Sequence, residues 1–404
     1  MAGDFEIVWL LNVGQAISLT LFEIGLMAGY KPALQIIMNQ EIKPLNVLIK
    51  GLLLFILFNL FIAAWQPQVG QFSLYNTLYP GRERLPFGEN PKQSYNLSLF
   101  NLDAMFASHV IAGINKADSE FRVIIVGDSS VWGTLLKPEE TLAGQLNADN
   151  LNACGKNVRA YNLGYPTISL TKDVMLLPYG MQYDPDLVIW MTTLDAFPLE
   201  KQTSTPLVAN NEEKTRELAT HYGLRVEADD PNFEAKSFWG KTFVGDRRAW
   251  ADFFRLQIYG VMWSATGIDQ IYPSDYEKAQ TDFEADDSYH DLTAPLTEDD
   301  LAINALEAGF NVVGDTSMLL VNEPMLISSG ANSDIRYNFF YSRWAYDDYR
   351  EIMTTLSQQN GWTYVDLWNI VPANEFTNSA IHLTPAGENM LAETLAPYIL
   401  ENCK

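Results

Sequence analysis

The sequence has few cysteines and few basic residues. Two cysteines in 404 residues exclude a cysteine-based metal cluster and a disulfide-dense scaffold. Lys and Arg number 26 against 50 Asp and Glu, a formal net charge of −24. This excess of negative charge repels phosphate backbones and anionic lipid headgroups, so we expect neither nucleic-acid binding nor a polybasic membrane anchor. With 48% hydrophobic and 19% charged residues, the chain is neither disordered nor a coiled coil.

A long apolar run near the N-terminus indicates a membrane span. Residues 45–65 carry one charged side chain, Lys50, near the start of the run, and Trp65 stands at its end. The run is long enough to cross a bilayer, with Lys50 and Trp65 suited to the two interfaces. It lacks the short apolar region and the small-residue cleavage site of a secretory signal, so we expect it to be retained. A buried core helix is the alternative.

Residues 7–28 form a second apolar stretch, which carries Asn12, Gln15 and Glu23. It is either a second span, which we favour, or a helix lying in the membrane interface. The region between the two stretches and the start of the second one hold Lys31, Lys43 and Lys50 against Glu41, whereas the first residues of the chain hold Asp4 and Glu6. The positive-inside rule therefore predicts that everything after residue 65 lies on the extracytoplasmic side, with one span or with two.

The rest of the chain predicts an α/β domain preceded by an arm. Residues 66–120 are rich in proline, glycine, asparagine and aromatic residues and predict an ordered extracytoplasmic arm. From residue 121, short apolar runs typical of buried strands alternate with helical patterns. The strands are expected at residues 122–127, 158–163, 187–191, 317–321 and 362–367, and the helices at residues 139–152, 170–182, 297–313, 341–359 and 385–400. This order predicts a doubly wound, flavodoxin-like, three-layer parallel sheet over residues 121–404.

An insertion at about residues 197–295 follows the third expected strand. Connections this long are usually functional, and this one emerges where open α/β sheets bind ligands. Residues 247–263 are amphipathic and aromatic, and residues 282–291 form an acidic loop that we expect to be solvated. The insertion is interpreted as a lid or as a docking surface for a partner.

The motif Gly-Asp-Ser-Ser-Val-Trp-Gly at residues 127–133 carries the clearest chemical signal. It follows the first strand directly, so Ser129 stands in a tight turn where backbone N–H groups can face an oxyanion. A serine nucleophile needs a base, and the chain has four histidines. Only His382, between the last strand and the last helix, is expected at the same edge of the sheet. The other three, His109, His221 and His290, are expected to pack in the core or lie at the surface.

At these residues the sequence resembles the SGNH/GDSL hydrolases, a family of esterases and O-acyltransferases. The resemblance covers roughly residues 121–195 and 298–402. It implies that Ser129 is the nucleophile, that its N–H contributes to the oxyanion hole, and that His382 is the base. A second motif, Tyr-Asn-Leu-Gly-Tyr-Pro-Thr at residues 161–167, implies that Gly164 donates its N–H to the oxyanion hole.

The sequence departs from the family pattern in the oxyanion hole. Leu194 stands where the family has an asparagine that donates to the oxyanion. Loss of one such donor typically lowers the rate by about 10²–10³ unless another group replaces it. Thr193 is a candidate replacement.

A second departure concerns the group that orients the histidine. The family pattern is Asp-x-x-His, and Ser379 occupies the aspartate position, with Asn378 before it. Asn378 or Ser379 could hold the ring by a hydrogen bond, but neither stabilises an imidazolium as an anion does. Asp366 and Glu375 are candidate carboxylates from elsewhere.

These features predict a membrane-anchored, extracytoplasmic serine esterase or O-acyltransferase acting on acylated carbohydrate or a cell-envelope polymer. A tethered domain of this kind resembles the SGNH partners of membrane-bound O-acyltransferases, which implies such a membrane protein as a partner. The alternative is a catalytically degenerate domain that serves as a scaffold subunit of a membrane complex. No cofactor and no metal are expected, since no His/Asp/Glu cluster has ligand spacing. Cys154 and Cys403 end the first and last helices, so they could form a disulfide outside the cell; the sequence leaves this open.

Overall fold

The computed structural model describes residues 43–67, 69–71, 81–87, 102–227, 229–233, 236–266 and 275–402. The chain divides into two compact units, Met1–Ala64 and Trp65–Lys404. Helix α3 (Pro44–Trp65) is, among the described residues, the one helix long and apolar enough to cross a membrane. Its apolar window has a mean hydropathy of 2.5 and is only 17% buried, unlike the core helix of a soluble domain. The second predicted span, residues 7–28, lies outside the described residues.

The second unit is built on a six-stranded sheet with the order β2-β3-β1-β4-β5-β6. Every neighbouring pair is parallel except β2 and β3, which are antiparallel. The strands are β1 (Glu120–Val126), β2 (Asn152–Ala153), β3 (Lys156–Asn162), β4 (Leu187–Thr192), β5 (Ser317–Asn322) and β6 (Thr363–Asp366). The predicted parallel α/β sheet is confirmed. The two-residue edge strand β2 was not predicted.

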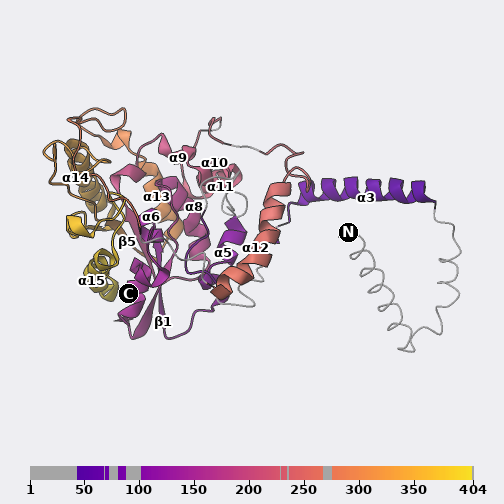
Figure 1. Cartoon of the computed structure of the whole chain (residues 1–404), viewed down its shortest axis with the longest axis horizontal. Coiled ribbons are helices and arrows are strands. Elements are labelled where there is room, and N and C mark those ends of the chain that lie inside the picture. Colours follow the sequence, from indigo (N-terminus) through magenta and orange to yellow (C-terminus); the bar gives the residue numbers. More distant parts are fainter. Residues whose placement is uncertain are drawn as a thin grey trace. The chain divides into compact units, whose positions relative to one another are not determined.

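Helices cover both faces of the sheet, which gives the three layers expected from the sequence (Figure 1). Helices α8, α13 and α14 contribute to the core on one face, and α7 and α15 to the core on the other. The main helices are α7 (Leu142–Ala148), α8 (Leu170–Met181), α11 (Glu212–Tyr222), α12 (Arg247–Thr266), α13 (Ile303–Val313), α14 (Arg343–Asn360) and α15 (Pro385–Glu401). Shorter ones are α5 (Leu102–Ala107), α6 (Ser129–Trp132), α9 (Lys201–Ser204) and α10 (Pro206–Ala209), with 3-10 turns at Val69–Gln71, Val110–Gly113, Pro138–Glu140, Leu194–Ala196, Glu298–Asp300 and Ala373–Glu375.

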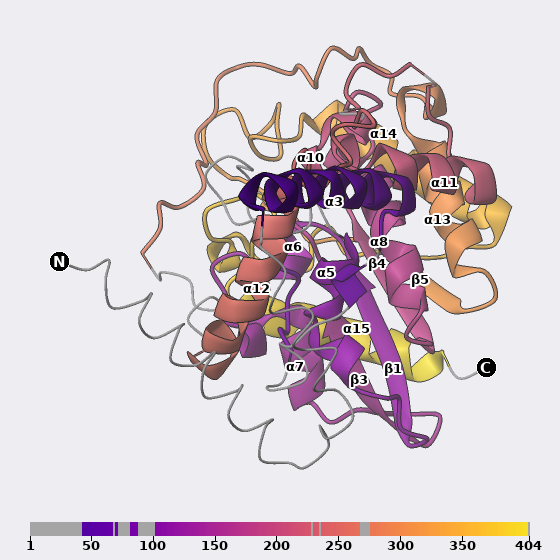
Figure 2. The same cartoon turned by 90° about the vertical axis from the view of Figure 1, so that its right-hand side faces the viewer.

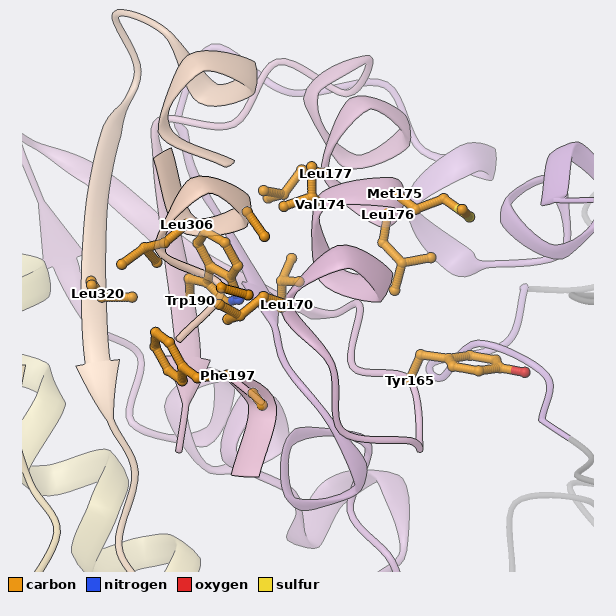
Figure 3. Packing of buried hydrophobic residues seen from close by; sticks show 14 of the residues in the cluster. Tyr165, Leu170, Val174, Met175, Leu176, Leu177, Trp190, Phe197, Leu306 and Leu320 are labelled. Atoms are coloured by element: carbon orange, nitrogen blue, oxygen red, sulfur yellow. The ribbon is translucent and has the colours of Figure 1, made fainter. Parts of the chain in front are cut away.

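The central strands are apolar on both sides because each side faces a separate core. In β1, Ile124 and Val126 belong to one buried cluster, and Val123 and Ile125 belong to the other. Figure 3 shows the first of these clusters, in which Trp190 of β4 packs among leucines from α8 and α13. Strands β1, β4 and β5 are parallel neighbours in the sheet (Figure 2), so their carboxyl ends lie at the same edge.

Two predicted helices are shorter in the structure. The stretch at residues 139–152 begins with a 3-10 turn, and α7 starts only after Thr141, whose side chain accepts a hydrogen bond from the Gly144 N–H at 3.3 Å. The stretch at residues 297–313 likewise begins with a capped 3-10 turn before α13. Thr141 stands between the first turn and α7 and caps the helix, whereas Thr297 precedes the second turn and α13 follows Ala302, which has no side-chain cap.

The predicted arm packs against the domain where it is described. Leu85, Met105 and Phe106 are buried in the same cluster as the sheet residues. The arm and the α/β domain therefore form one compact unit.

The insertion combines a buried part and an exposed part. Leu207, Val208 and Leu218 of its first helices are buried in the core. In α12, by contrast, Ile258 and Met262 are 65% and 57% exposed. Cys154 is disulfide-bonded. Cys403, the candidate partner that the sequence offers, lies outside the described residues.

Candidate active site

The turn after β1 exposes Ser129 at the carboxyl edge of the sheet. Asp128 caps the short helix α6, because its Oδ1 accepts a hydrogen bond from the Ser130 N–H at 2.8 Å. Ser129 is the first residue of α6 and is half-buried. The first N–H groups of a helix have no intrahelical acceptor, so the Ser129 N–H is positioned to donate to a ligand.

The structure brings Ser129 and His382 together although they are far apart in the sequence. The distance from Ser129 Oγ to His382 Nε2 is 2.8 Å. The His382 ring is held on its other side by Asn378, whose Oδ1 lies 2.8 Å from Nδ1. With Nδ1–H donating to Asn378, Nε2 carries the lone pair that accepts the Ser129 proton, which is the tautomer a general base requires.

A short loop fixes Asn378 and His382 relative to each other. The Thr377 N–H donates to the His382 carbonyl at 2.8 Å, and Phe376 pairs with Leu383 in an antiparallel bridge. Thr384 then caps α15 by accepting the Gly387 N–H. Backbone hydrogen bonds and a helix cap therefore fix the loop on both sides of His382.

The electrostatic state of His382 follows from burial without a carboxylate partner. Desolvation lowers the pKa of His382 to about 4. The imidazole is therefore neutral at neutral pH and able to accept a proton. Asn378, unlike an aspartate, supplies no charge to raise the pKa of the ring.

The other residues considered as orienting groups have different partners. Asp366 accepts hydrogen bonds from Asn322 Nδ2 at 2.8 Å and from Arg350 Nε at 2.8 Å. Glu375 accepts from the Thr384 hydroxyl. Ser379 is half-buried and, among the described contacts, makes none with His382.

Two of the expected oxyanion-hole residues form hydrogen bonds with other residues of the protein. The Gly164 N–H donates to Asn162 Oδ1 at 3.0 Å, and Thr193 Oγ1 lies 2.7 Å from the Tyr341 hydroxyl. Leu194 is fully buried in the core. The oxyanion roles of Gly164 and Thr193 remain predictions.

Gly164 has a steric role that the structure makes plain. A Cβ atom there would lie 2.5 Å from the Trp132 backbone nitrogen and 2.8 Å from the Val131 carbonyl carbon. Only glycine allows the loop after β3 to pack this closely against the turn at residues 127–133, which carries Ser129.

The sequence did not predict a buried polar cluster that lies beneath the turn carrying Ser129. Lys172 of α8 pairs with Asp173 and donates to the Gly127 carbonyl at 2.8 Å. Glu323, which follows β5, accepts a hydrogen bond from the Ser130 hydroxyl. Two signals could have found these residues: adjacent opposite charges in an otherwise apolar helix, and an acidic residue directly after a buried strand.

The remaining histidines lie away from the nucleophile. His109 is fully buried, and its Nε2 lies 3.0 Å from the Asn162 carbonyl oxygen. His221 contacts the Glu217 carbonyl at the surface, and His290 lies between Asp195 and Glu200. Within the described ranges, no group of three or more His, Cys, Asp and Glu side chains could hold a metal ion.

Comparison with known proteins gives distant structural neighbours only. No protein-family model matches the chain, and no curated protein sequence matches it. An aryl esterase from M. smegmatis is 15% identical, with 70% of this chain and 99% of that chain covered and a TM-score of 0.31. A carbohydrate acetylesterase family member from Sinorhizobium meliloti is 10% identical, with 69% and 99% covered and a TM-score of 0.30. A G-D-S-L family lipolytic protein from Desulfitobacterium hafniense is 9% identical, with 69% and 98% covered and a TM-score of 0.29.

Proposed function

We propose that this protein is a membrane-anchored serine esterase or O-acyltransferase that acts on acylated carbohydrate or a cell-envelope polymer. The observation that carries the proposal is the continuous hydrogen-bonded series Ser129–His382–Asn378, with both distances at 2.8 Å. It has the arrangement of a nucleophile, a base and an orienting group. An asparagine fills the third position in papain-like Cys-His-Asn proteases, so an amide is compatible with turnover.

The reaction proceeds in two acyl-transfer steps. Ser129 Oγ attacks the acyl carbonyl carbon while its proton passes to His382 Nε2. Asn378 Oδ1 holds Nδ1–H of the imidazolium, which then gives the proton to the departing alcohol oxygen, leaving the acyl group on Ser129. In the second step His382 takes a proton from water or a sugar hydroxyl, whose oxygen attacks the acyl-enzyme carbonyl carbon. The bond to Ser129 Oγ then breaks, Ser129 Oγ takes that proton back from His382, and the acid or the new ester is released. The Ser129 N–H, with Gly164 as the second proposed donor, stabilises the tetrahedral oxyanions.

The test is turnover of two ester substrates by the full chain in detergent. We expect hydrolysis of p-nitrophenyl acetate and release of acetate from an acetylated oligosaccharide, both lost in Ser129→Ala. A surface control, Ser288→Ala in the exposed part of the insertion, should keep wild-type turnover. Turnover that survives in Ser129→Ala would contradict the proposal.

Localisation on the extracytoplasmic side belongs to the same proposal. Helix α3 has the length and exposure of a span, and Lys31, Lys43 and Lys50 before it or near its start favour placing the domain outside. Modification of a cysteine introduced at Ser288 by a membrane-impermeant thiol reagent in intact cells tests this. Labelling only after lysis would place the domain in the cytoplasm.

A second candidate function is a scaffold subunit of a membrane complex, with a membrane-bound O-acyltransferase as one candidate partner. Buried Leu194 at the family's asparagine position and the exposed apolar side chains Ile258 and Met262 of α12 favour it. It predicts co-purification with a membrane protein, lost in Ile258→Asp and retained in Ser129→Ala. If Ile258→Asp leaves the set of co-purified proteins unchanged, α12 is not the docking surface.

A further inference from the structure

Glu323 lies directly behind the nucleophile turn. Its side chain is 2% exposed, and its N–H donates to the Thr192 carbonyl at 3.0 Å, which ties it to the end of β4. Its Oε2 accepts the hydrogen bond from Ser130, the neighbour of Ser129. Since the Ser130 N–H is also bound to Asp128, residue 130 is held through both its backbone and its side chain.

The space around Glu323 shows that it does not itself reach a substrate. It lines a cavity of about 10 Å³ together with Ser130, Glu388 and apolar side chains. A volume of this size holds at most one water molecule. The hydrogen bond that joins the Glu323 side chain to the turn carrying Ser129 is the one from Ser130.

Burial of this carboxyl group is costly, which calls for an explanation. Among the described groups, Glu323 Oε1 has no hydrogen-bond partner although it is buried. The charged and titratable groups around it are Asp128 of the turn, Lys172 and Asp173 of α8, and Glu388 of α15. An apolar residue would avoid the desolvation cost but would leave the Ser130 hydroxyl without its acceptor.

The protonation state of Glu323 determines which substitution should preserve its hydrogen bond with Ser130. Burial is the main cause that raises the pKa of Glu323 well above its usual value. The nearby carboxyl groups of Asp128, Asp173 and Glu388 raise it further. A neutral carboxyl offers Ser130 a carbonyl-type acceptor, and the amide of glutamine offers the same atom in the same place.

We infer that Glu323 is a positioning residue: through its hydrogen bond to Ser130, it fixes the turn that presents Ser129 to His382. This inference rests on the proposed function, because it requires Ser129 to be a nucleophile. By this inference, the residue that follows β5 helps to position the nucleophile.

The test measures how fast a fluorophosphonate probe in excess labels the full-length protein in detergent. The rate constant reports the reactivity of folded molecules, whereas the labelled amplitude reports how many are folded. We expect Glu323→Ala and Ser130→Ala each to lower the rate constant at least about tenfold with the amplitude retained, because small misplacements of a reacting group are costly. Glu323→Gln should stay within about threefold of wild type.

Two further variants separate positioning from a general packing effect. Glu388→Gln changes a buried acid of the same cavity that does not bond to Ser130, and it should label at the wild-type rate. The double variant Glu323→Ala/Ser130→Ala should be labelled no more slowly than Glu323→Ala alone, because the two substitutions remove the same hydrogen bond.

The outcomes distinguish the inference from the proposed function. If Ser130→Ala labels at the wild-type rate, or if Glu323→Ala lowers only the amplitude, Glu323 is structural and the inference is overturned, while the proposed function stands. If the wild-type protein is not labelled, the proposed function fails and the inference fails with it. Should Glu323→Ala not fold, Ser130→Ala and Glu323→Gln decide the question.

Discussion

Asn378 Oδ1 lies 2.8 Å from His382 Nδ1, and Asn378 precedes His382 by four positions in the chain. The SGNH pattern that the sequence resembles has its carboxylate three positions before the histidine, where this chain has Ser379. Compared with that pattern, the group that faces Nδ1 in this chain lies one residue earlier and is an amide instead of a carboxylate. Geometry is kept, because the oxygen of the amide faces Nδ1, whereas the charge that stabilises an imidazolium is lost.

Restoring the charge at this position should raise activity. In Asn378→Asp, a carboxylate would face Nδ1, stabilise the imidazolium and raise the pKa of His382. We expect the rate of p-nitrophenyl acetate hydrolysis at pH 7.5 to rise roughly tenfold, and to fall roughly tenfold in Asn378→Leu, which cannot hold the ring. Equal rates in all three proteins would show that Asn378 does not orient His382.

The pH dependence of labelling should reflect the unusual pKa of His382. Because burial lowers this pKa to about 4, the neutral base persists well below the ordinary titration range of histidine. The fluorophosphonate labelling rate should stay constant from pH 8 to about pH 5 and fall below that, as protonation removes the acceptor on Nε2. In Asn378→Asp the midpoint should move to higher pH. A wild-type midpoint near 6.5, the ordinary pKa of histidine, would contradict the burial argument.

Gly164 should tolerate no side chain. A methyl group there would meet the backbone of Trp132 and Val131, so Gly164→Ala should displace the nucleophile turn. We expect at least about a hundredfold loss of the labelling rate, since displacements of about 1 Å cost this much. Gly51→Ala, in α3, meets no atom within 4 Å and serves as the matched control. An unchanged rate in Gly164→Ala would contradict the close approach of these two loops.

The buried acid Glu388 should make the protein less stable at alkaline pH. Burial raises the pKa of Glu388 to about 8. Its folded-state pKa is therefore higher than its unfolded-state pKa, so its contribution to stability is complete below about pH 4.5 and is lost as the pH rises through 8. Glu388→Gln does not titrate. Its Tm should match wild type near pH 5 and exceed it by a few degrees at pH 8.5. A Tm difference that does not change with pH would contradict this.

The sequence predicted the sheet well because its strands are short, apolar on both faces and separated by helices. Ser129 and His382 could be predicted as partners because each follows a strand of a parallel sheet, which places both at one edge. Asn378 could be considered but not chosen over Ser379, because the choice depends on the conformation of a loop. Lys172 and Glu323 could be noticed as charged residues in apolar surroundings, but their contacts could not be predicted, since these depend on which side chains meet beneath the turn.

The most direct test of the account is the mass of the intact protein after reaction with a fluorophosphonate probe. We predict addition of one probe to the wild-type chain, located by peptide analysis at Ser129, and no addition to Ser129→Ala with its thermal unfolding unchanged. An unmodified wild-type protein, or a probe carried by Ser129→Ala, would contradict the assignment of Ser129 as the nucleophile.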